Sequence, residues 1–235
     1  MRQIILDTET TGLEPQQGHR IIELAGIELL DRRYSRSNFH RYLNPGRESD
    51  PGALQVHGLT TEFLQDKPRF ADIADEFLDY IRDAELIIHN APFDVGFLNA
   101  ELALIDREPL AAYCKSVTDT LRMAKDLHPG KRNSLDALCE RYQVDNSRRT
   151  LHGALLDAEL LGDVFLAMTR GQESLVIDHV PAGDAGARRQ KNERANSLVV
   201  LSASDEEMAA HADQLAKINK ASQGGCLWLQ LTGNP

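Results

Sequence analysis

The chain has 235 residues, of which 42% are hydrophobic and 26% are charged. Its length fits one ordinary α/β domain with an appendage better than two full domains. The formal net charge is −10, which argues against a free-standing protein that binds nucleic acid through a large basic face. Two short basic pairs, Lys131–Arg132 and Arg148–Arg149, are candidate local patches, and we interpret them first as solvated loop charges.

The cysteine content and the N-terminus predict a cytoplasmic protein. Cys114, Cys139 and Cys226 are odd in number and lack the spacing of zinc ligands, which favours a reducing compartment. Met1–Gln3 runs directly into an apolar strand, so we expect no signal peptide. No apolar run approaches the length of a membrane span, so we expect no membrane contact.

In chain order, the hydrophobic pattern predicts an initial run of strands and then alternating helices and strands. The expected strands are 2–8, 20–30, 34–43, 85–89 and 114–119. The expected helices lie within 51–66 and at 70–82, 92–105, 120–127, 134–142 and 153–169. This order predicts an α/β fold, with a mixed sheet and helices on its faces. Periodicity alone does not distinguish between α/β folds of this kind.

The first candidate site residues lie at the end of strand 2–8. Side chains alternate between the two faces of a strand, so Asp7 and Glu9 point the same way. Two neighbouring acids on one face repel each other unless a cation lies between them. Gly12 then lets the chain turn away. The alternative is an ordinary strand followed by a polar turn, since Asp and Thr favour turns.

A second cluster, His89-Asn90-Ala91-Pro92-Phe93-Asp94, follows strand 85–89. Asn90 can cap a helix, and Pro92 suits a first helical turn. Asp94 then lies in that first turn, where the helix dipole favours an anion. The alternative is that Asp94 is only an N-terminal helix acid.

The third cluster opens the helix at 153–169. Asp157 interrupts the apolar face of this helix, and a carboxylate that faces a core is costly unless it is paired or bound to metal. His152 lies at the helix entry, where the alternative role is a cap or a packed ring. Magnesium and manganese prefer oxygen ligands, and a neutral histidine can take a proton from water. Together the three clusters predict a two-metal nuclease site.

These clusters also carry a family resemblance. Asp-x-Glu, His-Asn-x-x-Phe-Asp and His-x-x-x-x-Asp, in this order, resemble the motifs of the DEDDh family of 3′→5′ exonucleases. Val56–Thr60, Lys131–Leu138 and Arg149–Ala154 are similar to the proofreading (epsilon) subunits of bacterial DNA polymerase III, a branch of this family. The resemblance covers residues 1–172 strongly and the C-terminal residues moderately, and it implies a ribonuclease-H-like fold.

The resemblance implies a role for each matching position. The residues expected to hold two divalent cations, Mg²⁺ or Mn²⁺, are Asp7, Glu9, Asp94 and Asp157. His152 is expected to be the general base. The residues expected to bind the terminal nucleotide are Asp7, Glu9, His57, Phe93 and Asp157. For His57 the alternative is a turn histidine before Gly58. Gly52 stands where relatives can carry an acid near the nucleotide sugar, which puts that contact in doubt.

The composition changes after Gly171. Residues 173–195 are polar and of mixed charge, which is typical of a flexible linker. Residues 196–235 contain a helix from Asp205 to Asn219 with Ser204 as its cap, and two apolar segments that we interpret as strands, 198–201 and 226–229. This piece is too short for an ample core, so we expect it to order on a partner. The resemblance implies the polymerase alpha subunit, and the alternative is an appendage that folds back on the nuclease domain.

A short segment at 172–177 resembles the Gln-x-x-Leu-x-apolar motif with which bacterial proteins bind the sliding clamp. Its candidate clamp-binding residues are Gln172, Ser174 and Leu175. The alternative is that these residues are the end of the preceding helix.

The sequence therefore predicts three parts: an exonuclease domain at 1–172, a linker at 173–195 and a polymerase-binding segment at 196–235. The predicted function is 3′→5′ proofreading on single-stranded or frayed DNA ends. Such an enzyme does not need to recognise particular bases, because a mismatched terminus costs less free energy to unpair than a paired one. The alternatives are a DEDDh exonuclease that acts on RNA ends, and a non-catalytic subunit that stabilises a polymerase.

Overall fold

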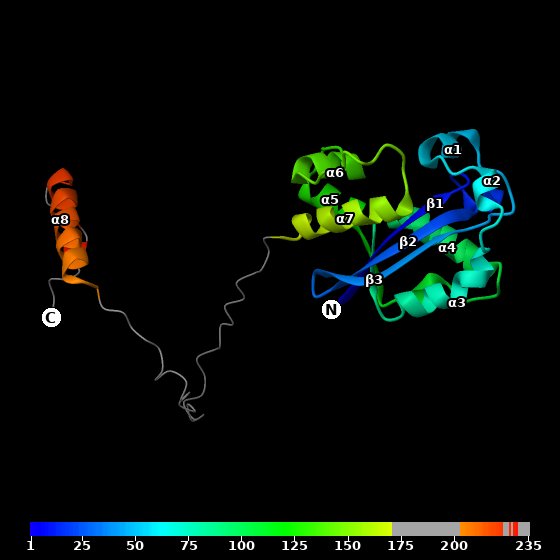
Figure 1. The fold of residues 1–235 in the computed structure, drawn as a ribbon, viewed down its shortest axis with the longest axis horizontal. Coiled ribbons are helices and arrows are strands. Elements are labelled where there is room, and N and C mark those ends of the chain that lie inside the picture. Colours follow the sequence, from blue (N-terminus) through cyan, green and yellow to red (C-terminus); the bar gives the residue numbers. More distant parts are fainter. Residues whose placement is uncertain (171–202, 223–225, 227, 230–235) are drawn as a thin grey trace, which may run out of the picture. The chain divides into compact units, whose positions relative to one another are not determined.

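The structure is a computed structural model that describes residues 1–170, 203–222, 226 and 228–229. Its chain divides into two units (Figure 1). The first contains a sheet with its covering helices, and the second contains one long helix. Across the described residues, every helix is too short or too polar to cross a lipid bilayer.

A mixed sheet forms the centre of the first unit. Its strands are β1 (Arg2–Thr10), β2 (Ile21–Leu30), β3 (Arg33–Tyr42), β4 (Glu85–Ile88) and β5 (Ser116–Asp119). Their order in space is β3-β2-β1-β4-β5. The pairs β1–β2 and β2–β3 are antiparallel, whereas β1–β4 and β4–β5 are parallel. The predicted fold class is confirmed, and β1 is the central strand.

Helices cover both faces of the sheet (Figure 1). They are α1 (Pro51–His57), α2 (Thr61–Leu64), α3 (Phe70–Ile81), α4 (Ala91–Ala103), α5 (Thr120–Leu127), α6 (Leu135–Tyr142) and α7 (Ala154–Met168), with two 3₁₀ turns, η1 (Pro15–Gln17) and η2 (Leu110–Ala112). Each α-helix lies within a few residues of its predicted position, whereas the two 3₁₀ turns were not predicted.

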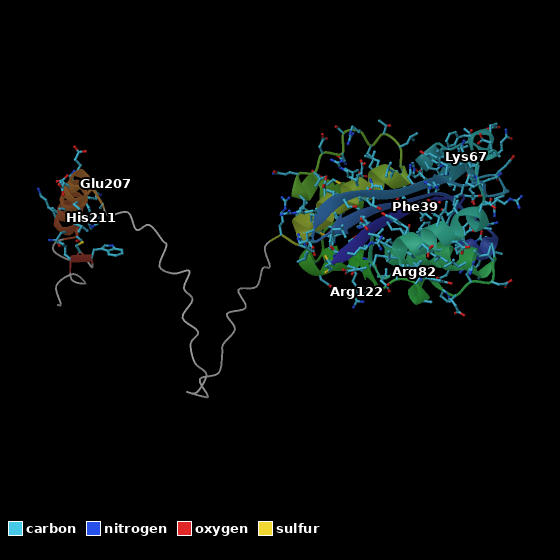
Figure 2. The ribbon with its side chains drawn as sticks, turned by 60° about the horizontal axis from the view of Figure 1, so that its bottom comes forward. Phe39, Lys67, Arg82, Arg122, Glu207 and His211 are labelled. Atoms are coloured by element: carbon cyan, nitrogen blue, oxygen red, sulfur yellow. The ribbon has the colours of Figure 1, made fainter. Side chains whose placement is uncertain are left out.

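The alternation of β1 divides the core into two clusters. Ile4 and Leu6 pack with α3 and α4 on one face, and Ile5 packs with α5, α6 and α7 on the other. On the first face, the ring centroids of Phe39 in β3 (Figure 2) and Phe77 in α3 are 5.6 Å apart. By the same alternation, the odd-numbered residues at the end of β1 share the face of α7.

The start of α4 differs from the sequence prediction in one respect. Asn90 precedes the helix, but its backbone is left-handed, with φ of 63°, and its side chain makes no capping hydrogen bond. Instead, the Asn90 carbonyl accepts from the Phe93 N–H at 3.0 Å, and the Asp119 carboxylate accepts from the Asn90 N–H at 3.1 Å. The prediction of a side-chain cap at Asn90 is therefore wrong. Pro92 does lie at the first turn, as predicted.

The second unit is built on α8 (Asp205–Ala221), which runs slightly past its predicted end. Ser204 caps it as predicted: its hydroxyl accepts from the Glu207 N–H, and the Glu207 carboxylate accepts from the Ser204 N–H. Trp228 and Leu229 are helical, so the predicted strand there is wrong. Residues 171–202 lie outside the described residues, and with them the clamp motif, the linker at 173–195 and the apolar segment 198–201.

Candidate active site

The parallel pairing of β1 with β4 brings the predicted site residues together. The C-terminal ends of these strands meet at one edge of the sheet, where Asp7 and Glu9 end β1 and the 89–94 segment leaves β4. The N-terminal turn of α7 brings Asp157 to the same edge. One open cavity there is lined by all five predicted metal and base residues, Asp7, Glu9, Asp94, His152 and Asp157.

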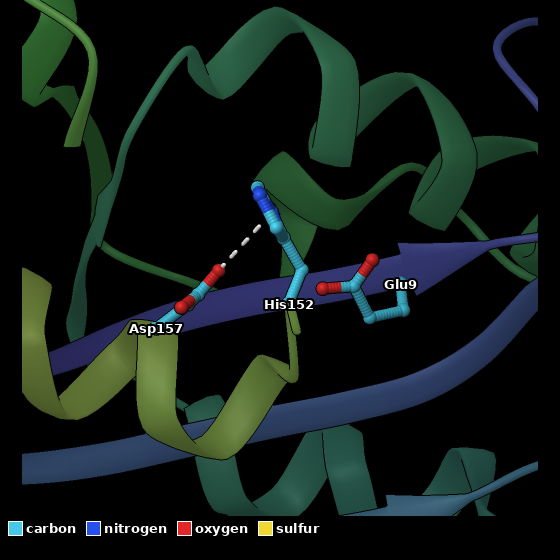
Figure 3. A group of neighbouring side chains, drawn as sticks. All are labelled: Glu9, His152 and Asp157. Atoms are coloured by element: carbon cyan, nitrogen blue, oxygen red, sulfur yellow. Dashed lines mark ion pairs between the residues drawn. The ribbon is translucent and has the colours of Figure 1, made fainter. Parts of the chain in front are cut away.

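Three of these side chains lie close together beside β1 (Figure 3), where His152 Nδ1 is 3.5 Å from Asp157 Oδ2. One ligand atom each from Glu9, His152 and Asp157 lies within 4.8 Å of the other two. Glu9 and Asp157 are buried, whereas the His152 side chain is 46% exposed at the mouth of the cavity. Two buried carboxylates with a histidine suit a divalent cation that prefers oxygen ligands.

Asp94 is held from the opposite face of β1. It lies in the first turn of α4, and its carboxylate accepts a hydrogen bond from the Thr8 hydroxyl at 2.7 Å. Burial raises the pKa of Asp94 to about 7, although the Thr8 hydrogen bond acts in the opposite direction. Thr8 of β1 therefore positions Asp94, while its neighbours Asp7 and Glu9 supply two further acids to the cavity.

The remaining acids repel one another inside this cavity. Burial raises the pKa of Glu9 to about 8, and the negative charges of Asp157 and Glu23 add to the effect. Burial likewise raises the pKa of Asp7 well above its ordinary value, with further contributions from Asp94, Glu9 and Asp157. A bound cation reverses this effect, because it stabilises the ionised carboxylates. The donor set therefore fits a divalent metal site.

Arg149 is a site residue that the sequence prediction missed. Its guanidinium pairs with both Asp157 oxygens, from Nε at 2.6 Å and from Nη2 at 2.7 Å. It also donates to Asp136 at 2.8 Å and to His152 Nδ1 at 3.0 Å. The Arg149 side chain is only 7% exposed, so the interpretation as a solvated loop charge is wrong for this residue. Its place three residues before His152 was the signal available in the sequence.

His57 and Phe93 border an adjoining cavity that shares Thr8 and Glu9 with the first one. His57 is buried, and its Nδ1 accepts from the Leu59 N–H at 3.0 Å. The proton of the neutral ring therefore sits on Nε2, which is buried without a hydrogen-bond partner among the described residues. Burial lowers the pKa of His57. The ring thus presents an unused donor beside this cavity.

Gly52 lies in the wall of the same cavity. No described atom outside its chain neighbours comes within 4 Å of where its Cβ would stand. The space that an acid would fill at this position is therefore open.

Comparison with known proteins identifies the family. A model of the exonuclease family matches residues 4–165, which span the sheet and all the site helices. DNA polymerase III subunit epsilon of Salmonella typhimurium is 52% identical over 97% of both chains. The same subunit of Escherichia coli is 51% identical over 97% of both chains, and that of Rickettsia felis is 45% identical over 94% of this chain and 99% of its own. The chain belongs to the DNA polymerase III epsilon family.

Solved structures of other exonucleases share the fold. Exonuclease X in complex with 5′ overhanging duplex DNA superposes with a TM-score of 0.57 at 25% identity, over 71% of this chain and 90% of its own. The nuclease domain of 3′hExo, a DEDDh family member bound to rAMP, has a TM-score of 0.61 at 18% identity, over 71% of this chain and 90% of its own. At 18% identity, the similarity to 3′hExo shows only that the two proteins share a fold.

Membership of the epsilon family confirms the predicted resemblance and the predicted exonuclease activity. The chain is a 3′→5′ exonuclease with the divalent-metal dependence of its family, and a subunit of a DNA polymerase. The role of each individual site residue stays a prediction.

Proposed function

We propose that the chain removes mispaired nucleotides from 3′ DNA ends by two-metal hydrolysis of the terminal phosphodiester. The observation that carries this proposal is the convergence of four carboxylates and His152 on one cavity. The residues that would hold two Mg²⁺ or Mn²⁺ ions are Asp7, Glu9, Asp94 and Asp157. The chemistry supplied by such ions when bound is acidification of the attacking water and stabilisation of the leaving 3′-oxygen.

His152 would take the proton of the attacking water. It lies at the cavity mouth rather than inside the core, so it reaches both solvent and the acids. Its backbone is anchored, because the His152 N–H donates to the Val56 carbonyl at 3.0 Å. This bond links the His152 segment to α1, the helix that borders the adjoining cavity.

The adjoining cavity would receive the terminal nucleotide, with Asp7, Glu9 and Asp157 at its metal side. The His57 Nε2–H is a donor that a nucleotide oxygen would satisfy, since a buried donor without a partner costs free energy. Phe93 gives the shared wall an aromatic surface on which a base can pack. The pocket would take an unpaired strand end, so selection would follow from the ease of fraying.

The C-terminal segment 196–235 would dock the exonuclease on the polymerase alpha subunit. In its described part, α8 has no buried residue. Large apolar side chains are nevertheless exposed on this unit, namely Met208, Ile218, Trp228 and Leu229. A partner that covers these side chains would remove their apolar surface from water, which favours docking. Gln172, Ser174 and Leu175 would add a contact with the sliding clamp, and the assembly would act in the cytoplasm.

A primer-digestion experiment tests the proposal. The chain is incubated with a 3′-mismatched DNA primer, a 3′-paired primer and an RNA strand, each with and without Mg²⁺. We expect cleavage only with the metal, and faster cleavage of the mismatched DNA than of the paired DNA. Faster cleavage of the RNA strand than of the mismatched DNA primer would instead assign the chain to RNA ends.

A further inference from the structure

An open, positively charged hollow at α6 has no part in the chemistry described so far. Three cations line this basic hollow, Lys131, Arg132 and Arg141, together with one acid, Glu140. Among the described residues, none of these cations is paired with a carboxylate, unlike Arg149, which pairs with two. In a chain with a net charge of −10, the basic hollow is therefore a local excess of positive charge.

The loop that carries Lys131 and Arg132 is held in place by α6. Asn133 is buried, and its side-chain amide donates to the Lys131 carbonyl at 3.1 Å. Arg141 donates to the Asn133 side-chain oxygen at 2.9 Å and to the Arg132 carbonyl at 2.7 Å. The backbone is thus fixed, while the side chains of Lys131 and Arg132 are exposed. A ligand that binds these two side chains does not have to order the loop, which lowers the entropic cost of binding.

The basic hollow lies beside the cavity that contains the four carboxylates, which we call the catalytic cavity. Residues 134–136 at the start of α6 line the catalytic cavity, and Lys131 and Arg132 come shortly before them in the chain. Three residues of backbone span at most about 11 Å. The adjoining cavity shares Glu9 and Phe93 with the catalytic cavity but borders α1 instead. Figure 1 shows α6 and α1 at separate places, with the segment that leads into α7 between them.

This arrangement gives a bound strand a direction. A strand with its terminal nucleotide in the adjoining cavity, at α1, places the scissile phosphate at the carboxylates. The rest of the strand then continues beyond them, toward α6. Each nucleotide of that strand carries a negative charge, and lysine and arginine bind phosphates without reading the bases. Contacts of this kind suit an enzyme that has to accept every sequence.

We propose that Lys131 and Arg132 bind phosphates of the scissile strand a few nucleotides upstream of the bond that is cut. This inference rests on the proposed function, because it takes the terminal nucleotide to occupy the adjoining cavity. The basic hollow would set the direction in which the strand crosses the catalytic cavity. It would also add affinity that depends on the length of the strand and not on its sequence.

The dependence of hydrolysis on strand length tests this inference. One substrate is a DNA dinucleotide, whose only phosphodiester is the scissile one, and the other is a single strand of about eight nucleotides. The variant is the full chain with Lys131→Gln and Arg132→Gln, assayed at fixed Mg²⁺. For the longer strand, we expect KM to rise about five- to tenfold at low salt with kcat unchanged, since only binding is weakened. For the dinucleotide, we expect no change in either constant.

Salt dependence reports the number of phosphate contacts that the variant loses. A plot of log(1/KM) against log salt concentration should become shallower by about 1.4 for the longer strand, because each contact with a single-strand phosphate contributes about 0.7. A variant with Lys131→Arg and Arg132→Lys keeps both charges and should retain the wild-type KM and slope. A purely structural role of the two side chains would not change the slope.

Arg33→Gln with Arg36→Gln is the matched control. It removes the same charge from two exposed residues of β3 that line neither the basic hollow nor the other two cavities. Its KM and salt dependence should equal those of the wild type on both substrates. An equal effect in the two double variants would show that net charge, and not the basic hollow, controls binding, and would contradict the inference.

Two further results would overturn the inference. An equal loss on the dinucleotide and on the longer strand would show that the substitutions disturb the catalytic cavity itself. A loss on a 3′-mismatched duplex but not on the single strand would assign the basic hollow to the complementary strand. The proposed function fails by different results, namely no Mg²⁺-dependent cleavage of DNA by the wild type, or faster cleavage of RNA than of mismatched DNA.

Discussion

Glu9 shows how one residue links the metal site to stability. Its pKa in the folded chain is about 8, above the ordinary glutamate value of about 4.3. The folded state thus binds this proton more tightly than the unfolded chain does. Its stabilising effect is fully present below about pH 4.3 and is lost as the pH rises through about 8.

We therefore expect the melting temperature of the metal-free chain to fall between pH 5 and pH 8. Glu9→Gln should flatten this dependence and raise the stability at pH 8 by on the order of 1–3 kcal/mol, because it removes a buried like charge. Thermal unfolding followed by circular dichroism in a chelator measures both effects. An equally steep dependence in the variant would contradict the assignment.

Asp7 and Asp157 should respond differently to removal, although both should be essential for hydrolysis. Asp7→Ala relieves repulsion, so we expect a metal-free protein at least as stable as the wild type. Asp157→Ala leaves the buried guanidinium of Arg149 with Asp136 as its remaining carboxylate. We expect a loss on the order of 2 kcal/mol.

Urea unfolding and a primer-cleavage assay separate these two effects of the aspartate variants. Metal-dependent cleavage that survives in either variant would remove that residue from the metal set.

At the scale of residues, the sequence predicts those site residues whose position depends only on the strand or helix that carries them. Asp7 and Glu9 share a face because strands alternate, and Asp157 faces inward because it interrupts an apolar stripe. Arg149 was not predictable in the same way. Its burial depends on Asp136 from α6 and Asp157 from α7, which meet only in the folded chain.

At the scale of elements, the loop after β1 is held by a close contact. Gly12 lies against the buried ring of His19, and a Cβ at Gly12 would stand 2.3 Å from a ring carbon. His19 is in turn hydrogen-bonded to Thr11 at 3.1 Å and paired with Asp50 at 3.4 Å. His19 therefore links the loop after β1 to Asp50 at the start of α1, on the wall of the adjoining cavity, and Gly12 leaves room for its ring.

Gly12→Ala should cost roughly 1–3 kcal/mol, because its Cβ would clash with the His19 ring, which is buried and held by Thr11 and Asp50. Gly52→Ala is a matched control on the same cavity wall, with no described neighbour within 4 Å of its Cβ position. Because Gly52 lies in α1, the alanine should leave stability unchanged or raise it by up to about 1 kcal/mol. The midpoints of urea unfolding, compared at equal m-values, measure the difference. Equal losses of unfolding free energy in the two variants would argue against the His19 contact.

The elements themselves were predictable because runs of apolar residues mark them, and polar or glycine-containing segments separate these runs. The failures fall where local conformation depends on distant groups. Asn90 adopts a left-handed backbone and makes its contact with Asp119 of the neighbouring strand β5. Trp228 and Leu229 have apolar side chains that suit a strand, but their segment is too short for periodicity to decide between strand and helix.

At the scale of the whole molecule, an acidic chain acts on a polyanion. The net charge of −10 leaves little general attraction for DNA, so affinity must come from the metal site, from local contacts such as the basic hollow and from a partner that delivers the strand end. The proposed tether to the polymerase would raise the local concentration of the exonuclease at the primer terminus. Intrinsic DNA affinity can then stay weak without loss of proofreading.

Truncation after Gly171 separates these contributions. The residues that line the two cavities all precede this point. Tethering raises affinity without a new contact at the active site, so hydrolysis of free single strands should stay within about twofold of wild type. Co-purification with the polymerase subunit and the enhancement on primed template should both be lost. Replacing Gln172 and Leu175 with alanine in the full chain should weaken only the clamp-dependent part of that enhancement. A stable complex between the truncated chain and the polymerase would place the binding surface on the exonuclease unit instead.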